Sequence, residues 1–158
     1  MSKLVLALLL LLSTAAAAET SWTLSGGVAS ATDMGTSRGG AAAAEVSYNT
    51  VLSDFNFELA GGYIGDQAEI GHFWYSSAQL ITSPLPLGLR FGVGLGVRTW
   101  SENIDRTLSW PVNFSLSAGV DVGSIRVQLR HFSNAGLHEP NWGESWVLLG
   151  WKFSGGSL

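Results

Sequence analysis

The side chains in this sequence best suited to chemistry are a histidine and a serine two residues apart, His131 and Ser133. They end an alternating apolar run and precede a segment rich in Gly, Asn and Pro, residues 134–143. Residues i and i+2 of a β-strand point to the same side, so on a strand these two side chains would be neighbours on one face. A histidine beside a serine hydroxyl can accept its proton, so the pair has the outline of a nucleophile and its general base.

The residues around this pair form a distinctive motif. Residues 131–137 read His-Phe-Ser-Asn-Ala-Gly-Leu, and residues 140–144 read Pro-Asn-Trp-Gly-Glu. This motif resembles the signature of the outer-membrane lipid A 3-O-deacylases, the PagL family. The resemblance is specific over residues 130–144 and is limited to length and strand pattern upstream.

The resemblance implies a reaction and roles for the motif residues. The reaction is hydrolysis of the ester-linked 3-hydroxyacyl chain at position 3 of lipid A, with Ser133 as the nucleophile and His131 as the general base. Backbone N–H groups of Asn134, Ala135 and Gly136 would hold the oxyanion, a contribution typically worth about 3 kcal/mol per donor.

The composition limits the class of protein. The 158 residues allow one domain, with 20 Gly, 7 Trp, no Cys and 13% charged residues. A mean hydropathy of +0.25 with only one long apolar stretch suggests hydrophobicity spread over alternating strands, as in a membrane barrel. A net charge of −4 and the lack of a basic patch argue against nucleic acid as a partner. No metal or cofactor is expected, because His72, His131 and His138 lack ligand spacing and there is no Cys.

The first residues have the order of a secretory signal. A basic residue precedes an apolar core at residues 4–12, and small residues follow as far as Ala18. The apolar core is about half of the roughly 20 residues that a membrane-spanning helix needs. We expect residues 1–18 to be removed by cleavage before Glu19, which leaves residues 19–158 as one barrel domain.

Eight segments alternate as strands do. In the clearest two, residues 89–98 and 108–119, bulky apolar residues alternate with small, polar or charged ones. The other strands are expected at residues 22–31, 40–49, 54–63, 70–82, 125–130 and 146–153. Polar loops are expected at residues 32–39 and 64–69, and the alanine run within residues 40–49 could also be helical.

Eight strands of about ten residues, each with one bulky apolar face and one face of small or charged residues, fit a small transmembrane barrel. The expected fold class is therefore all-β, an eight-stranded antiparallel barrel of the bacterial outer membrane, closed because lipid cannot pair with an open sheet edge. Its inner face would carry a network of opposite charges instead of a pore: Glu45, Glu58 and Asp121 with Arg90, Arg98, Arg126, Arg130 and Lys152. A soluble β-sandwich or lipocalin-like barrel is the alternative, but such proteins seldom reduce one face to Gly and Ser.

The barrel fixes where the pair would lie. With both termini in the periplasm, residues 134–143 are extracellular, so His131 and Ser133 lie at the level of the outer leaflet, beside lipid A and lipopolysaccharide. Both residues share the parity of the apolar residues in 125–129, so they continue the lipid-facing stripe. Taken alone, His131 could belong to the aromatic girdle at the membrane interface. Taken alone, Ser133 could be an ordinary serine at the end of a strand. Because polar groups facing lipid are costly, the pair together favours an active site that receives lipid laterally.

The third member of the site departs from the family's pattern. The family's acid lies one residue farther from the Pro-Asn-x-Gly turn, a position that is Ser145 here, whereas this sequence has Glu144. Alternation back from Val147 places Ser145 on the outer face and Glu144 inside, so Glu144 reaches His131 only if a bulge re-aims it. We expect Glu144 to be the orienting acid, with Ser145 as a neutral substitute and Glu139 as a second acidic candidate.

Two other classes of function fit the same barrel pattern. A non-enzymatic small outer-membrane barrel would share every feature except residues 131–144. A phospholipase or acyltransferase barrel would use the same serine and histidine on another lipid. The sequence leaves open the acyl-chain preference, latency in the native membrane, and whether the protein forms a homodimer.

Overall fold

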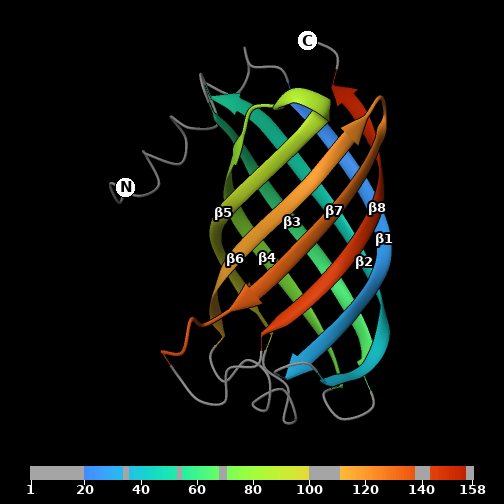
Figure 1. The fold of residues 1–158 in the computed structure, drawn as a ribbon, viewed down its shortest axis with the longest axis vertical. Helices are drawn as coiled ribbons and strands as arrows, with labels where there is room; N and C mark the ends of the chain where they lie inside the picture. Colours follow the sequence, from blue (N-terminus) through green and yellow to red (C-terminus); the bar gives the residue numbers. More distant parts are fainter. Residues whose placement is uncertain are drawn as a thin grey trace, which may run out of the picture.

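Eight strands form a closed barrel in the computed structural model, which describes residues 20–33, 36–52, 55–67, 71–99, 111–137 and 143–155. Each strand pairs antiparallel with the next, and β8 closes the barrel against β1 (Figure 1). The strands are β1 (Thr20–Asp33), β2 (Thr36–Leu52), β3 (Phe55–Gln67), β4 (Gly71–Thr82), β5 (Leu89–Arg98), β6 (Val112–Val122), β7 (Ile125–Ser133) and β8 (Glu144–Gly155). The expected fold, an eight-stranded antiparallel barrel, is confirmed.

Helical structure is minor in the part of the chain that the structure describes. A single turn of 3-10 helix, η2 (Pro86–Gly88), connects β4 to β5. No helix among the described residues has the length and apolar character needed to cross a membrane.

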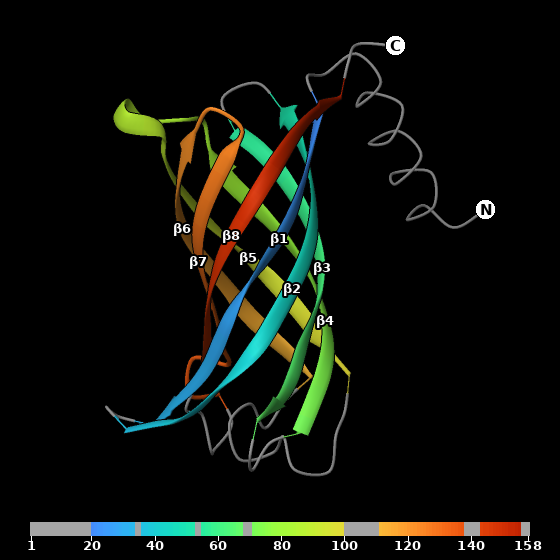
Figure 2. The same ribbon diagram turned by 90° about the vertical axis from the view of Figure 1, so that its right-hand side faces the viewer.

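Several strands are longer than the sequence pattern indicated. The loop expected at residues 32–39 is wrong, because β1 and β2 continue as a paired ribbon to Asp33 and Thr36. This ribbon extends beyond the neighbouring strands (Figure 2). Residues 64–67, also expected to form a loop, belong to β3, and residues 68–69 of that expected loop lie outside the described residues. Polar residues continue the backbone pairing past the apolar band, so their polarity does not mark a strand end.

The alanine run of β2 is extended and not helical. Ala42 pairs with Val28 on β1, and Ala43 pairs with Ile64 on β3. Pairing with β1 along the whole run, and with β3 from Ala43 onward, satisfies backbone groups in the extended form, which outweighs the intrinsic helix propensity of alanine. The expected strand residues 108–110 and the expected signal segment 1–18 lie outside the described residues.

The outer face of the barrel is apolar along every strand. Bulky side chains alternate outward with mostly small or polar ones that face inward, and many of the outward side chains expose about half of their surface: Trp22 51%, Leu24 58%, Phe91 50%, Val93 58%, Leu95 54%, Leu116 48%, Val147 48% and Trp151 53%. So large an exposed apolar surface needs a lipid environment, and the outward orientation predicted for the apolar face is confirmed.

Aromatic side chains gather at both ends of this apolar surface. Trp22 and Tyr48 contact each other near the start of β1, with ring centroids 4.9 Å apart. Tyr63 and Trp74 do so near the opposite end, with ring centroids 4.8 Å apart. Tyrosine and tryptophan favour membrane interfaces because their rings join an apolar body to a polar tip.

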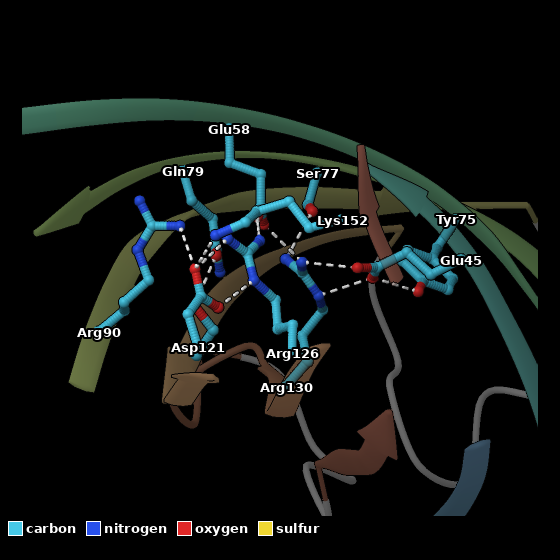
Figure 3. A network of polar contacts seen from close by, with 11 residues as sticks. Glu45, Glu58, Tyr75, Ser77, Gln79, Arg90, Asp121, Arg126, Arg130 and Lys152 are labelled. Atoms are coloured by element: carbon cyan, nitrogen blue, oxygen red, sulfur yellow. Dashed lines mark hydrogen bonds and ion pairs between the residues drawn. The ribbon is translucent and has the colours of Figure 1, made fainter. Parts of the chain in front are cut away.

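The predicted network of opposite charges lies inside the barrel (Figure 3). Arg130 is fully buried at its centre and donates to Glu45 Oε1 at 3.0 Å, Glu58 Oε1 at 2.6 Å and Ser77 Oγ at 3.0 Å. Tyr75 OH donates to the other oxygen of Glu45 at 2.6 Å. Four strands are therefore tied together by one guanidinium and its partners.

A second part of the network surrounds Asp121 near the end of the barrel where β1 begins. Arg126 Nε donates to Asp121 Oδ1 at 2.7 Å, and Arg90 and Lys152 each lie 3.3 Å from Oδ2. Arg126 also contacts Glu58 at 3.2 Å, which links the two parts (Figure 3). Because the buried carboxylates and guanidinium groups contact one another, their desolvation is partly offset.

Candidate active site

His131 and Ser133, two residues apart at the end of β7, both point to the outer face of the barrel. The residues between and before them, Arg126, Gln128, Arg130 and Phe132, are buried inside the barrel. Their cross-strand partners on β6 are Leu116 for His131 and Phe114 for Ser133, and both partners are exposed on the outer face. The predicted parity of the pair is therefore confirmed, and both residues are set into the apolar outer surface.

His131 has a hydrogen-bonding partner on the adjacent strand. Its Nδ1 lies 2.8 Å from Ser145 Oγ on β8, its direct cross-strand partner. With the proton on Nδ1, the ring donates to Ser145 and presents the Nε2 lone pair, as a general base requires. The serine is neutral, so it orients the ring without the charge stabilisation that a carboxylate gives to an imidazolium.

Glu144, the residue expected to orient His131, lies on the other face of the sheet. It pairs with Phe132, faces the barrel interior and has no exposed surface. Pairing of β7 with β8 is continuous from Ile125 to Phe132, so the bulge that Glu144 would need is absent from this ladder. The geometry thus brings Ser145, and not Glu144, to His131. Glu139, the other acidic candidate, lies outside the described residues.

The turn after β7 folds back onto Ser133. Ala135 N–H donates to Ser133 Oγ at 3.1 Å, Gly136 N–H donates to Asn134 Oδ1 at 2.9 Å, and Leu137 N–H donates to Asn134 O at 3.1 Å. Ala135 and Gly136 both have left-handed backbones, with φ of 56° and 77°. The N–H groups of Ala135, Gly136 and Leu137 are thus bound within the turn. Asn134, Ala135 and Gly136, the residues expected to hold the oxyanion, lie in this turn beside Ser133.

Three aromatic rings fill the barrel directly beneath the pair of His131 and Ser145. Phe132 and Trp146, which follow those two residues in sequence, pack inside with ring centroids 4.9 Å apart. Tyr75 contacts both, at 5.5 Å and 4.9 Å. This aromatic group holds β7 against β8 at the height where the outer-face residues meet.

The aromatic group departs from the sequence pattern, which indicated an inner face of small or charged residues. Phe132 and Trp146 break the pattern of small inner-face residues, and that break was the available signal. Space for the ring of Phe132 comes from Gly96 on β5, where a Cβ would collide with the ring. A small inner residue on one strand therefore leaves room for a large one on another strand. The spacing of residues along a single strand does not show this.

Comparisons with known proteins agree with this architecture. The family model described as lipid A 3-O-deacylase (PagL) matches residues 16–154. The crystal structure of the outer membrane enzyme PagL is similar with a TM-score of 0.57 and 17% identity, covering 84% of this chain and 98% of that one. Neisserial surface protein A is similar with a TM-score of 0.61 and 10% identity, covering 84% and 94%. At these identities the solved structures support the fold alone. No curated protein sequence matches.

Proposed function

Because the chain belongs to the lipid A 3-O-deacylase (PagL) family of bacterial outer-membrane esterases, we propose that Ser133 and His131 carry out its deacylation reaction. The substrate is lipid A within lipopolysaccharide, and the bond cleaved is the ester of the 3-hydroxyacyl chain at position 3. The proposed reaction needs no cofactor.

One observation carries this proposal: Ser133 and His131, whose ring is hydrogen-bonded to Ser145, lie on the outer face of the barrel and not in the lumen. His131 and Ser133 continue an exposed apolar stripe, and Phe114 and Leu116 lie beside them on β6. A purely structural barrel gains nothing from two polar side chains in that surface, because each must be partly desolvated there. A lipid ester, in contrast, can reach this position by lateral diffusion.

The proposed side of the membrane depends on which end of the barrel holds the site and which end holds the chain ends. β7 ends at Ser133, at the opposite end of the barrel from the start of β1 and the end of β8 (Figure 1). We propose that the chain ends are periplasmic, which places the turn at residues 134–137 at the extracellular end. The site would then lie in the outer leaflet, where lipid A is found.

The mechanism proceeds by acyl transfer through the serine. Ser133 Oγ attacks the ester carbonyl carbon while His131 Nε2 accepts the hydroxyl proton. The tetrahedral intermediate collapses, its bond to the sugar oxygen breaks, and that oxygen takes the proton from His131. Water then attacks the acyl-enzyme, His131 accepts the water's proton and returns it to Ser133, and the 3-hydroxy fatty acid leaves.

The turn after β7 supports this mechanism with backbone donors. The Ala135 N–H already contacts Ser133 Oγ, so it lies within reach of an oxygen that develops charge next to that atom. Gly136 N–H, now bound to Asn134 Oδ1, is the next donor along the turn. A donor of this kind, placed at the oxyanion, typically contributes about 3 kcal/mol to the transition state.

We assign the orienting role to Ser145 on the strength of its contact with His131. A hydrogen bond to a charged group contributes about 1.5–3 kcal/mol and a neutral one about 1 kcal/mol. Both a serine and a carboxylate can accept a hydrogen bond from the imidazolium, but only a carboxylate adds an opposite charge. The site would keep the geometry of a triad and lose part of its electrostatic stabilisation.

The decisive experiment is mass spectrometry of lipid A incubated with the purified protein in detergent. The expected product has lost one 3-hydroxyacyl chain and gained one hydroxyl at position 3, with the free 3-hydroxy fatty acid recovered. Ser133→Ala is the matched control, because it removes one oxygen and leaves the backbone ladder intact. Unchanged lipid A with the wild-type protein, in a preparation shown to be folded, rules out the proposed activity.

The same assay distinguishes the two related activities. A phospholipase would leave lipid A intact and release fatty acid from added glycerophospholipid, so that lipid is included in a parallel reaction. An acyltransferase would give lipid A with one more chain instead of one fewer. Either result would keep the serine and histidine as catalytic residues and replace the substrate.

A further inference from the structure

Gly143, the residue immediately before β8, contacts the ring of His131. The residue is buried, and its backbone is left-handed with φ of 69°. A Cβ built on it would lie 2.6 Å from His131 Cε1, 3.0 Å from His131 Nε2 and 3.2 Å from the carbonyl oxygen of Phe132. Contacts under 3.0 Å are essentially never made by real Cβ atoms, so only glycine leaves the ring where it is.

The left-handed backbone does not account for this contact. Gly123 and Gly136 have similar φ values of 60° and 77°, yet a Cβ on either would meet nothing within 4 Å. Those two glycines meet a conformational requirement alone. Gly143 meets a second requirement, because the imidazole occupies the space of its missing side chain.

The two contacts of the ring lie on different edges. Ser145 binds Nδ1, whereas the backbone of Gly143 packs against the edge formed by Cε1 and Nε2. A histidine side chain has several staggered χ1 positions, and one hydrogen bond to a neutral hydroxyl, worth about 1 kcal/mol, selects weakly among them. The backbone of Gly143, packed against the Cε1–Nε2 edge, blocks competing positions of the ring.

We propose that Gly143 is a positioning residue for His131, which holds the imidazole on Ser145 through direct contact with its Cε1–Nε2 edge. This inference rests on the proposed function, since it concerns the same histidine. It also explains why a neutral serine is sufficient at the orienting position: the ring is held sterically as well as by the hydrogen bond.

The activity test compares Gly143→Ala with Gly123→Ala. Both changes place alanine on a left-handed backbone, so the strain is matched, but only the first places a Cβ against the ring. Gly143→Ala should lower kcat by a factor on the order of 10², the effect of displacing a catalytic group by about 1 Å, with KM little changed. Gly123→Ala, in the turn between β6 and β7, should keep wild-type kcat.

A second variant separates the contact from backbone strain. Asparagine tolerates the left-handed region better than alanine and still carries a Cβ, so Gly143→Asn should lose activity as Gly143→Ala does. If either variant retained wild-type kcat while His131→Ala was inactive, the positioning role would be refuted.

A readout that does not depend on activity keeps this inference separate from the proposed function. In protein labelled with ¹⁵N-histidine, the imidazole signals of His131, assigned by their loss in His131→Ala, should shift in Gly143→Ala and in Ser145→Ala. They should not shift in Gly123→Ala. Unmoved signals in Gly143→Ala overturn the inference even if the enzyme deacylates lipid A. If the signals shift in Gly143→Ala but the wild-type protein has no deacylase activity, the contact is upheld and the proposed function is refuted.

Stability in the absence of the ring gives a final check. In the His131→Ala background the ring atoms are gone and only the 3.2 Å approach to the carbonyl oxygen of Phe132 remains, so Gly143→Ala should cost little more stability than Gly123→Ala does. In the wild-type background it should cost more. An equal cost in both backgrounds would show that the ring and Gly143 do not interact.

Discussion

His131 and Ser145 face each other on neighbouring strands, with Nδ1 and Oγ 2.8 Å apart, on the surface of the barrel that meets lipid. Glu144, one residue earlier, is turned into the barrel by the same alternation. The acidic residue of the motif and the partner of the histidine are therefore different residues in this protein. The variants described below separate their contributions.

Ser133→Ala and His131→Ala should each reduce deacylation by a factor on the order of 10⁴ or more, because each removes a member of the proton-transfer pair. Neither side chain takes part in the backbone ladder, so the barrel should stay folded. The double variant should be no worse than either single variant, since residues that act as a unit lose their effect together. Lipid A mass spectrometry provides the rates. Near-normal activity of Ser133→Ala would require another nucleophile.

Ser145→Ala should lower kcat, and Ser145→Glu should raise it. Alanine removes the hydrogen bond to Nδ1, which is worth about 1 kcal/mol, or about fivefold in rate. Glutamate places a carboxylate where the imidazolium forms, and the stronger charged hydrogen bond predicts a gain of up to about tenfold. Initial rates on lipid A in detergent measure both effects. A rate in Ser145→Glu below that of Ser145→Ala would contradict the orienting role.

Glu144→Gln should change kcat less than Ser145→Ala does. Glutamine keeps the size of the side chain, and position 144 faces the interior, on the opposite side of the sheet from His131. This order is the reverse of the one expected from the motif alone, in which Glu144 orients the histidine. A larger loss in Glu144→Gln, with unchanged unfolding behaviour, would return the orienting role to Glu144.

Arg130→Met should destabilise the barrel by about 3–5 kcal/mol, because it leaves the buried carboxylates of Glu45 and Glu58 without their shared cation. Lys152→Met is the control. Its ammonium group contacts Asp121 at 3.3 Å, but its side chain is 25% exposed, and Arg90 and Arg126 still contact that carboxylate. Its loss should be no more than about 1 kcal/mol. Urea unfolding in detergent measures both values, and equal losses would remove Arg130 from the centre of the network.

The folded protein should migrate differently in unheated and boiled detergent gels and give a β-rich circular dichroism spectrum in micelles. Both properties follow from a sheet that has no free edge and resists the detergent until it is heated. A helical spectrum in detergent would be incompatible with the closed barrel.

Alternation along the strands was sufficient to predict the barrel, its outward apolar face and the internal charges. It also placed His131 and Ser133 on the outer surface, because parity needs only the period of two. Alternation back from Val147 placed Ser145 outside and Glu144 inside, but one bulged residue between the motif and β8 would have exchanged their faces. Only the register of β8 against β7 shows that no bulge intervenes.

Other features depended on neighbours that are distant in the sequence. The inward position of Phe132 requires the space left by Gly96 on another strand. The ends of β1 and β2 depend on pairing between polar residues, which resemble a loop in composition. The pattern along one strand shows that Phe132 points inward, but it does not show which other strand leaves room for the ring or pairs with a polar segment.

The outer-surface position of His131 and Ser133 also determines how the reaction rate must be expressed. An enzyme that meets its substrate within a bilayer or micelle responds to the mole fraction of substrate in that phase and not to its amount per volume of water. Adding inert detergent at a fixed quantity of lipid A should therefore slow the reaction by surface dilution. In the cell, the corresponding variable is the lateral packing of lipopolysaccharide around the barrel wall.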